Sequence, residues 1–113
     1  MKAFLIESVR LGRAATSPII ILELLQGCRT EAERDSLKEK FESLLVLPVG
    51  QTEWERAYGL GFMLRRQGLA IPTADLIIAA VAIENNSILL HMDKHFEMIV
   101  RYSKLRTRTF GAV

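Results

Sequence analysis

Apolar residues along this chain of 113 residues recur mostly at helical spacing, and start and stop signals divide them into segments. Ser17 is a good N-cap, and a proline follows it at the first helical position. Thr30 with Glu33, and Thr52 with Glu55, have the spacing of capping boxes. The predicted helices extend over about residues 17–27, 30–43, 52–68, 73–84 and 94–101.

Two short apolar runs, residues 44–47 and 87–91, predict strands, and a weaker candidate lies near residues 107–110. Neither of the first two alternates in polarity, which is typical of strands covered on both faces in a parallel sheet. Strands separated by helices of this length predict an α/β layer fold with right-handed crossovers. The sequence contains no linker or internal repeat, so we treat residues 1–113 as a single domain.

Residues 1–11 contain no helix-capping signal like those that precede the later helices. Residues 3–11 resemble the last turns of an amphipathic helix that ends at Gly12. A parallel α/β fold would place a strand before that helix. We therefore expect roughly the first strand and the first helix to be missing from this chain.

Composition excludes several classes of protein. The hydrophobic fraction of 50% and the charged fraction of 25% are ordinary for a globular protein. No apolar run approaches the length of a membrane span, and the one near the N-terminus is too short for a signal peptide. A single cysteine, Cys28, excludes an intramolecular disulfide and a multi-cysteine zinc site. We expect a cytoplasmic protein.

Positive charge gathers late in the chain. Arg65 and Arg66 form a small basic cluster. A longer basic segment beyond residue 93 contains a single acid, Glu97. Such segments suit contacts with phosphate groups, although a solvated basic tail explains them equally well. The basic residues of this segment are Lys94, Arg101, Lys104, Arg106 and Arg108.

Three carboxylates, Glu23, Asp75 and Asp93, each lie inside an otherwise apolar stretch. Buried acids are rare unless they are paired or bind a metal, because removing water from a charge is costly. Asp75 lies in the first turn of a predicted helix, and Asp93 follows a predicted strand, where ligands gather in open α/β sheets. Glu23 lies in the middle of an apolar helix.

If the three acids converge, the site suits Mg²⁺ or Mn²⁺, since hard cations prefer oxygen ligands. Such an ion would orient a phosphodiester and help to generate the attacking hydroxide. Each acid also has a structural explanation: Asp75 as a residue favoured by the helix dipole, Asp93 as a helix cap, and Glu23 as part of an exposed polar face.

The segments around these acids resemble the acidic motifs of PIN-domain ribonucleases, especially the VapC-type toxins of bacterial toxin–antitoxin pairs. Residues 17–27 resemble the second motif and residues 71–80 the third. Residues 89–96 resemble the fourth motif, including an aromatic residue three positions after the acid. Residues 54–57 and 64–68 are also similar, and the resemblance extends from about Val9 to Lys104.

The resemblance implies a three-layer αβα fold with a parallel sheet and a homodimer. It also implies Mg²⁺- or Mn²⁺-dependent cleavage of RNA, and a cognate antitoxin that covers the groove. Carried over by position, Glu23, Asp75 and Asp93 are the catalytic carboxylates that bind the metal. Lys94 and Arg65 are candidates for contact with the RNA backbone.

Two departures from the family pattern are visible. His91 occupies a position near the fourth acid where the family often has Thr or Ser, and we expect a strand-end histidine with a local hydrogen bond. The family also begins with a central strand that ends in an Asp, whereas no aspartate precedes Asp35 here. Glu7 lies in the wrong kind of segment to replace it.

Loss of a central strand would leave two unpaired backbone edges. We expect one of three remedies: a longer gene product that begins upstream of Met1, strand exchange with a second copy, or closure of the remaining strands into a smaller sheet.

The sequence therefore predicts a metal-dependent endoribonuclease of the VapC type with an incomplete acidic set. The alternative is a catalytically inactive PIN-like module that binds an antitoxin or RNA. A helical adaptor without a site would require the three acids to be unrelated.

Overall fold

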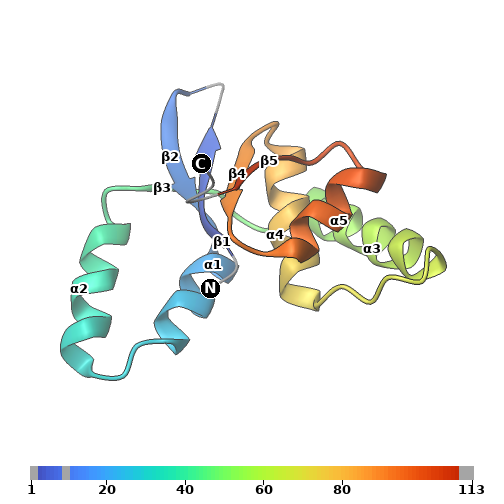
Figure 1. Cartoon of the computed structure of the whole chain (residues 1–113). Coiled ribbons are helices and arrows are strands. Elements are labelled where there is room, and N and C mark those ends of the chain that lie inside the picture. Colours follow the sequence, from blue (N-terminus) through green and yellow to red (C-terminus); the bar gives the residue numbers. More distant parts are fainter. Residues whose placement is uncertain (1–2, 9–10, 110–113) are drawn as a thin grey trace.

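The computed structural model describes residues 3–8 and 11–109 and contains a five-stranded mixed sheet with helices packed against it (Figure 1). The α/β class predicted from the sequence is confirmed. The elements are β1 (Ala3–Ser8), β2 (Arg13–Thr16), α1 (Pro18–Gln26), α2 (Glu31–Phe41), β3 (Leu45–Val46), α3 (Gln51–Arg66), α4 (Thr73–Glu84), β4 (Ile88–His91), α5 (Lys94–Tyr102) and β5 (Arg106–Thr109).

The strands lie in the order β3-β2-β1-β4-β5, with β1 in the centre. The two outer pairs, β2 with β3 and β4 with β5, are parallel as expected. The central strand β1 is antiparallel to both of its neighbours. The sheet is therefore mixed rather than wholly parallel.

The prediction of a helix end over residues 3–11 is wrong, because residues 3–8 form β1; residues 9 and 10 lie outside the described part of the chain. Ile6 pairs with Ala15 on one side and with Leu89 on the other, and all three side chains are fully buried. Gly12, at a φ of +61°, takes the left-handed conformation before the chain returns as β2, which the sequence did not predict.

The physical reason is backbone pairing. A helix in this place would leave the inner edges of β2 and β4 without partners, and buried N–H and C=O groups without partners are costly. As a strand, the same segment pairs with both edges. The gap expected at the centre of the sheet is thus filled by the chain's own first strand, a solution that none of the three expected remedies included.

Helix starts agree with local signals in most cases. The side chains of Ser17 and Thr30 accept hydrogen bonds from backbone N–H groups in the first turns of α1 and α2, as their cap roles predict. The helix α3 begins earlier than predicted, at the N-cap Gly50, whose N–H donates to Glu53 Oε1 at 2.9 Å. The N-cap position of α4 is occupied by Pro72, which makes no side-chain capping hydrogen bond.

The helix α4 is the most deeply buried element, since every residue from Ile77 to Ala82 is buried. It packs against α3, where Gly61 permits a close approach: a Cβ there would lie 3.2 Å from Leu76 Cδ1. This packing fixes the start of α4, which carries Asp75. Among residues 3–8 and 11–109, no helix has the length and apolar character that crossing a membrane requires.

The central position of β1 predicts a large effect of truncating its buried side chain. Ile6→Ala should lower the free energy of unfolding by about 2–5 kcal/mol, because it removes buried apolar contacts and leaves a cavity. Leu11→Ala is the control, since Leu11 lies in the turn after β1 and is 49% exposed. Its effect should stay within about 0.5 kcal/mol. Urea denaturation measures both, and equal effects would contradict the central placement of β1.

Candidate metal centre

Asp75 is the most deeply buried acid among the described residues. It lies in the first turn of α4, and its exposed fraction is 0%. Its backbone N–H donates to the carbonyl oxygen of Pro72 at 3.0 Å, which closes the first turn. The positive end of the helix dipole lies here and favours a negative charge.

Asp93 lies at a second helix start. It follows β4 directly and is the N-cap of α5, and its Oδ1 accepts the N–H of His95 at 2.8 Å. Its side chain is 16% exposed. The amino ends of α4 and α5 thus both point their carboxylates toward one place, at the carboxyl end of β4.

A histidine joins these two acids. His95 Nδ1 lies 3.0 Å from Asp93 Oδ1 and 3.4 Å from Asp75 Oδ2. One donor atom from each of the three residues lies within 4.8 Å of the other two. Both acids were predicted from the sequence and His95 was not, although a residue two positions after a helix cap lies beside the cap and is a candidate on that ground.

The third predicted acid, Glu23, does not belong to this cluster of described residues. It is half-buried near the middle of α1, a helix that packs against α4. The structure thus brings Asp75 and Asp93 together and leaves Glu23 on the neighbouring helix.

His91 makes the local hydrogen bond expected of a strand-end histidine. Its ring is almost completely buried, and Nδ1 accepts the backbone N–H of Asp93 at 3.0 Å. The proton is therefore assigned to Nε2, which donates to Glu97 Oε2 at 2.7 Å. Through this ring, a residue of α5 helps to fix the main chain of Asp93.

Glu97 is held from a third element as well. The hydroxyl of Thr107, on β5, donates to Glu97 Oε2 at 2.8 Å. This hydrogen bond lowers the pKa of the Glu97 carboxyl below its usual value, although partial burial acts in the opposite direction. The hydrogen bond that His91 donates and the charge of Arg101 lower this pKa further.

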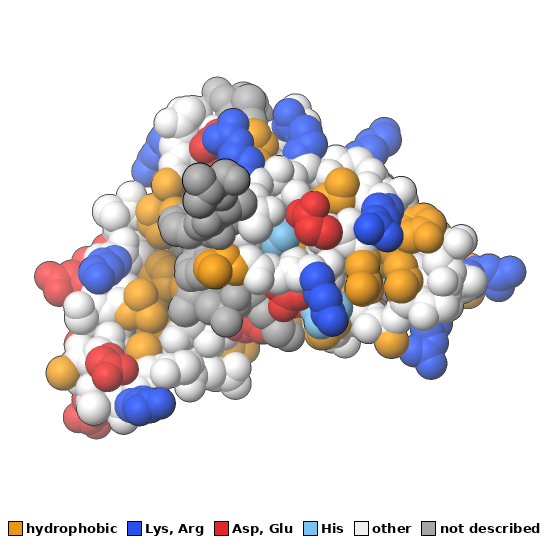
Figure 2. All heavy atoms as spheres, in the orientation of Figure 1, with side chains coloured by type: hydrophobic (Ala, Val, Ile, Leu, Met, Phe, Trp, Pro, Cys, Tyr) orange, Lys and Arg blue, Asp and Glu red, His pale blue; other side chains and the backbone are white. Residues whose placement is uncertain are grey.

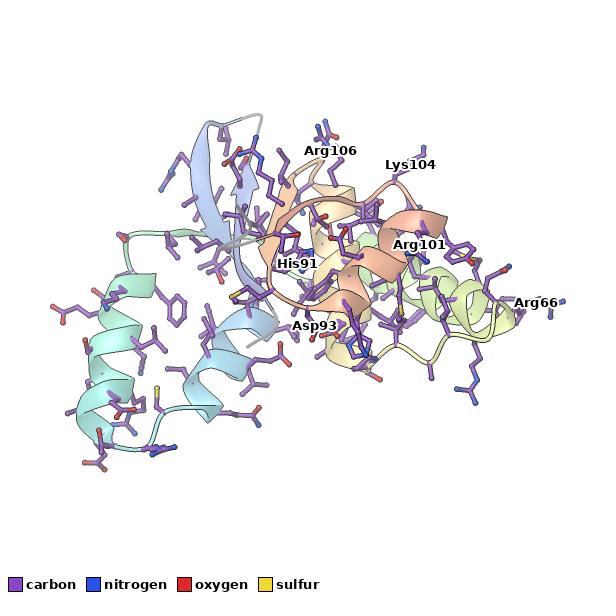
Figure 3. All side chains as sticks on the ribbon, viewed as in Figure 1. Arg66, His91, Asp93, Arg101, Lys104 and Arg106 are labelled. Atoms are coloured by element: carbon purple, nitrogen blue, oxygen red, sulfur yellow. The ribbon has the colours of Figure 1, made fainter. Side chains whose placement is uncertain are left out.

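The basic residues that the structure describes do not form one patch at the site. In the parallel pairing of β4 with β5, Arg106 lies opposite Ile88, whereas Asp93 follows the other end of β4. Figure 3 accordingly shows Arg106 and Lys104 on the far side of α5 from Asp93. Figure 2 shows Lys and Arg side chains scattered over the visible face. Only Lys94, which follows Asp93 directly, is adjacent to the cluster in sequence.

The family model described as the PIN domain matches residues 2–101. This chain belongs to the PIN domain family. The fourth-motif region and the buried Asp75 both lie within the matched residues, and the resemblance noted from the sequence is confirmed.

Solved structures agree with this assignment. A chain of VapBC-1 from nontypeable Haemophilus influenzae is 23% identical, with a TM-score of 0.75 and coverage of 88% of this chain and 76% of that chain. A chain of VapBC2 from Rickettsia felis, solved bound to a DNA fragment from its promoter, is 24% identical with a TM-score of 0.74. The match covers 85% of this chain and 74% of that chain. At these identities the likeness establishes the fold. No curated protein is similar enough to count as a match.

PIN domains typically use divalent metal ions, and the residues of this PIN domain fit such an ion. Two carboxylates supply the oxygen donors that Mg²⁺ and Mn²⁺ prefer, and an imidazole nitrogen is a further accepted donor for Mn²⁺. Asp75 and Asp93 would hold the ion, and it would offset the cost of burying two like charges side by side.

The Glu97 contacts predict a measurable titration shift. In the wild type, NMR should show the Glu97 carboxyl titrating below its ordinary pKa. Thr107→Val removes the donating hydroxyl at nearly constant shape, so the pKa of Glu97 should rise toward its ordinary value. Because a lowered folded-state pKa stabilises the fold above the unfolded value, the stability difference between the two proteins should shrink below about pH 4.5. An unchanged Glu97 pKa in the variant would contradict this account.

Proposed function

We propose that this PIN domain is a Mg²⁺- or Mn²⁺-dependent endoribonuclease and the toxin of a VapBC-type toxin–antitoxin pair. The observation that carries the proposal is the convergence of Asp75 and Asp93 at two helix N-termini. Two carboxylates and an imidazole held together at two helix starts match the donor atoms with which proteins bind divalent cations.

Each residue of the site has a role in this proposal. Asp75 and Asp93 bind the ion. Glu23, which lies outside their cluster on the helix that packs against α4, is the third carboxylate that we assign to the metal centre. Lys94 follows Asp93 and binds the phosphate backbone of single-stranded RNA. A bound divalent ion supplies Lewis-acid chemistry, since it neutralises charge on the phosphodiester and acidifies water. The two helix N-termini add their positive ends on the same side.

The proposal includes protein partners. The structures with which this chain shares its fold are VapBC assemblies, and this supports a cognate antitoxin as partner and a cytoplasmic setting. Large apolar side chains exposed on α1 and α3, namely Leu22, Tyr58 and Phe62, offer surface for an antitoxin and for a second copy in a homodimer.

A second candidate function is a PIN-like module that binds an antitoxin or RNA without cleaving it. The observation in its favour is that Glu23 lies outside the cluster, which leaves two carboxylates and a histidine in direct proximity. A smaller set of carboxylates holds a hard cation more weakly.

Replacement of either clustered acid tests the nuclease. Asp75→Asn and Asp93→Asn should each lower Mn²⁺-dependent cleavage of single-stranded RNA by at least about a hundredfold, because each loses a charge that holds the ion. Asn is an isosteric replacement and a good N-cap, so Asp93→Asn should leave the start of α5 intact.

Glu39→Gln is the matched control, because Glu39 is an exposed acid of α2 outside the cluster, and its activity should equal that of the wild type. Thermal denaturation verifies that each variant is folded. Full activity in both aspartate variants would refute the nuclease assignment. An inactive wild type that still binds its antitoxin or RNA would establish the second candidate instead.

A further inference from the structure

His95 differs from the other histidine in what its ring contacts. Both ring nitrogens of His91 form hydrogen bonds, one with Asp93 N–H and one with Glu97. His95 Nδ1 is buried, yet among the described residues it forms no hydrogen bond of good geometry. It lies instead between two carboxylate oxygens, at 3.0 and 3.4 Å. This nitrogen is therefore available to a ligand that the two acids share.

The spacing of the three donor atoms suits one metal ion. Neighbouring ligands of an octahedral Mg²⁺ or Mn²⁺ ion are about 3 Å apart, because each bond is about 2.0–2.2 Å long. The separations of His95 Nδ1 from the two carboxylates match that edge, and all three donors lie within 4.8 Å of one another.

The backbone holds His95 in this position. Its N–H donates to Asp93 Oδ1, so the cap that starts α5 also fixes the residue that carries the imidazole. The rest of the ring is partly accessible, with 28% of the side chain exposed. A donor at a fixed helix start, facing two acids, is preorganised for coordination.

We infer that His95 is a metal ligand, which makes the site a mixed carboxylate–imidazole centre that prefers Mn²⁺ to Mg²⁺. Imidazole is a good ligand for first-row transition ions, whereas Mg²⁺ prefers oxygen donors and keeps its waters. The inference rests on the proposed function only in that the centre binds a divalent cation.

Pulsed electron paramagnetic resonance tests the coordination directly. The chain of residues 1–113 is loaded with Mn²⁺ alone at about pH 8, where an ordinary imidazole is unprotonated. The wild type should show nitrogen modulation from a coordinated imidazole. His95→Gln should abolish that modulation, and the exposed control Lys104→Gln should retain it. Absence of Mn²⁺ binding, absence of modulation in the wild type, or its persistence in His95→Gln would overturn the inference.

Calorimetric affinities separate coordination from other roles of the ring. If His95 is a ligand, His95→Gln should weaken Mn²⁺ binding by about tenfold or more and Mg²⁺ binding by less than about threefold. If the ring acts only as a cation that competes for the two acids, both affinities should rise. If it only supports the fold, both should fall by the same factor. Either result would overturn the inference.

The nuclease proposal can fail separately. Nitrogen-coupled Mn²⁺ in a protein that does not cleave RNA would refute the nuclease and retain the His95 ligand. Cleavage that depends on Asp75 and Asp93, with no nitrogen coupling, would retain the nuclease and refute the ligand.

Discussion

The pairing of β1 between β2 and β4 is the constraint on which the rest of the structure depends. It supplies backbone hydrogen-bond partners to the inner edges of both β2 and β4, and it buries Ile6 in the centre of the sheet. Its direction also determines the site. Because β1 is antiparallel to β4, Ala3 pairs with His91 beside the cluster, while Glu7 pairs with Ile88 at the opposite end. The acid of β1 therefore faces away from Asp75 and Asp93, and it forms an ion pair with Arg108 instead.

The sequence predicted those elements whose signals are local. Ser17 and Thr30 cap their helices as expected, and the apolar run ending at His91 forms β4. The hairpin of β1 and β2 could not be predicted in the same way. A short apolar segment fits a helix or a strand, and only partners distant in the chain, such as Leu89 for Ile6, decide between them.

The residues at the site also differ in whether local sequence signals could predict their positions. Asp75 and Asp93 were predictable because each belongs to a local helix start within an apolar context. Whether Glu23 reaches them depends on how α1 packs against α4, which no local pattern encodes. His95 was not predicted because acidic motifs indicate carboxylates, whereas its place between the two acids arises from the spacing between two helix starts. The positions of Glu23 and His95 both depend on distances between elements rather than on the elements themselves.

The buried imidazole of His91 is accommodated because the surrounding elements supply hydrogen-bond partners for both of its nitrogens. A buried imidazole needs a partner for each nitrogen, and here Asp93 N–H and Glu97 supply them, while Thr107 anchors Glu97. The contacts connect β4, α5 and β5 around the main chain of Asp93. A cation bound by Asp75 and Asp93 would add α4 to that set, so that metal binding and folding stabilise one another. The mixed sheet thereby supports the same arrangement of helix starts that the motifs predicted.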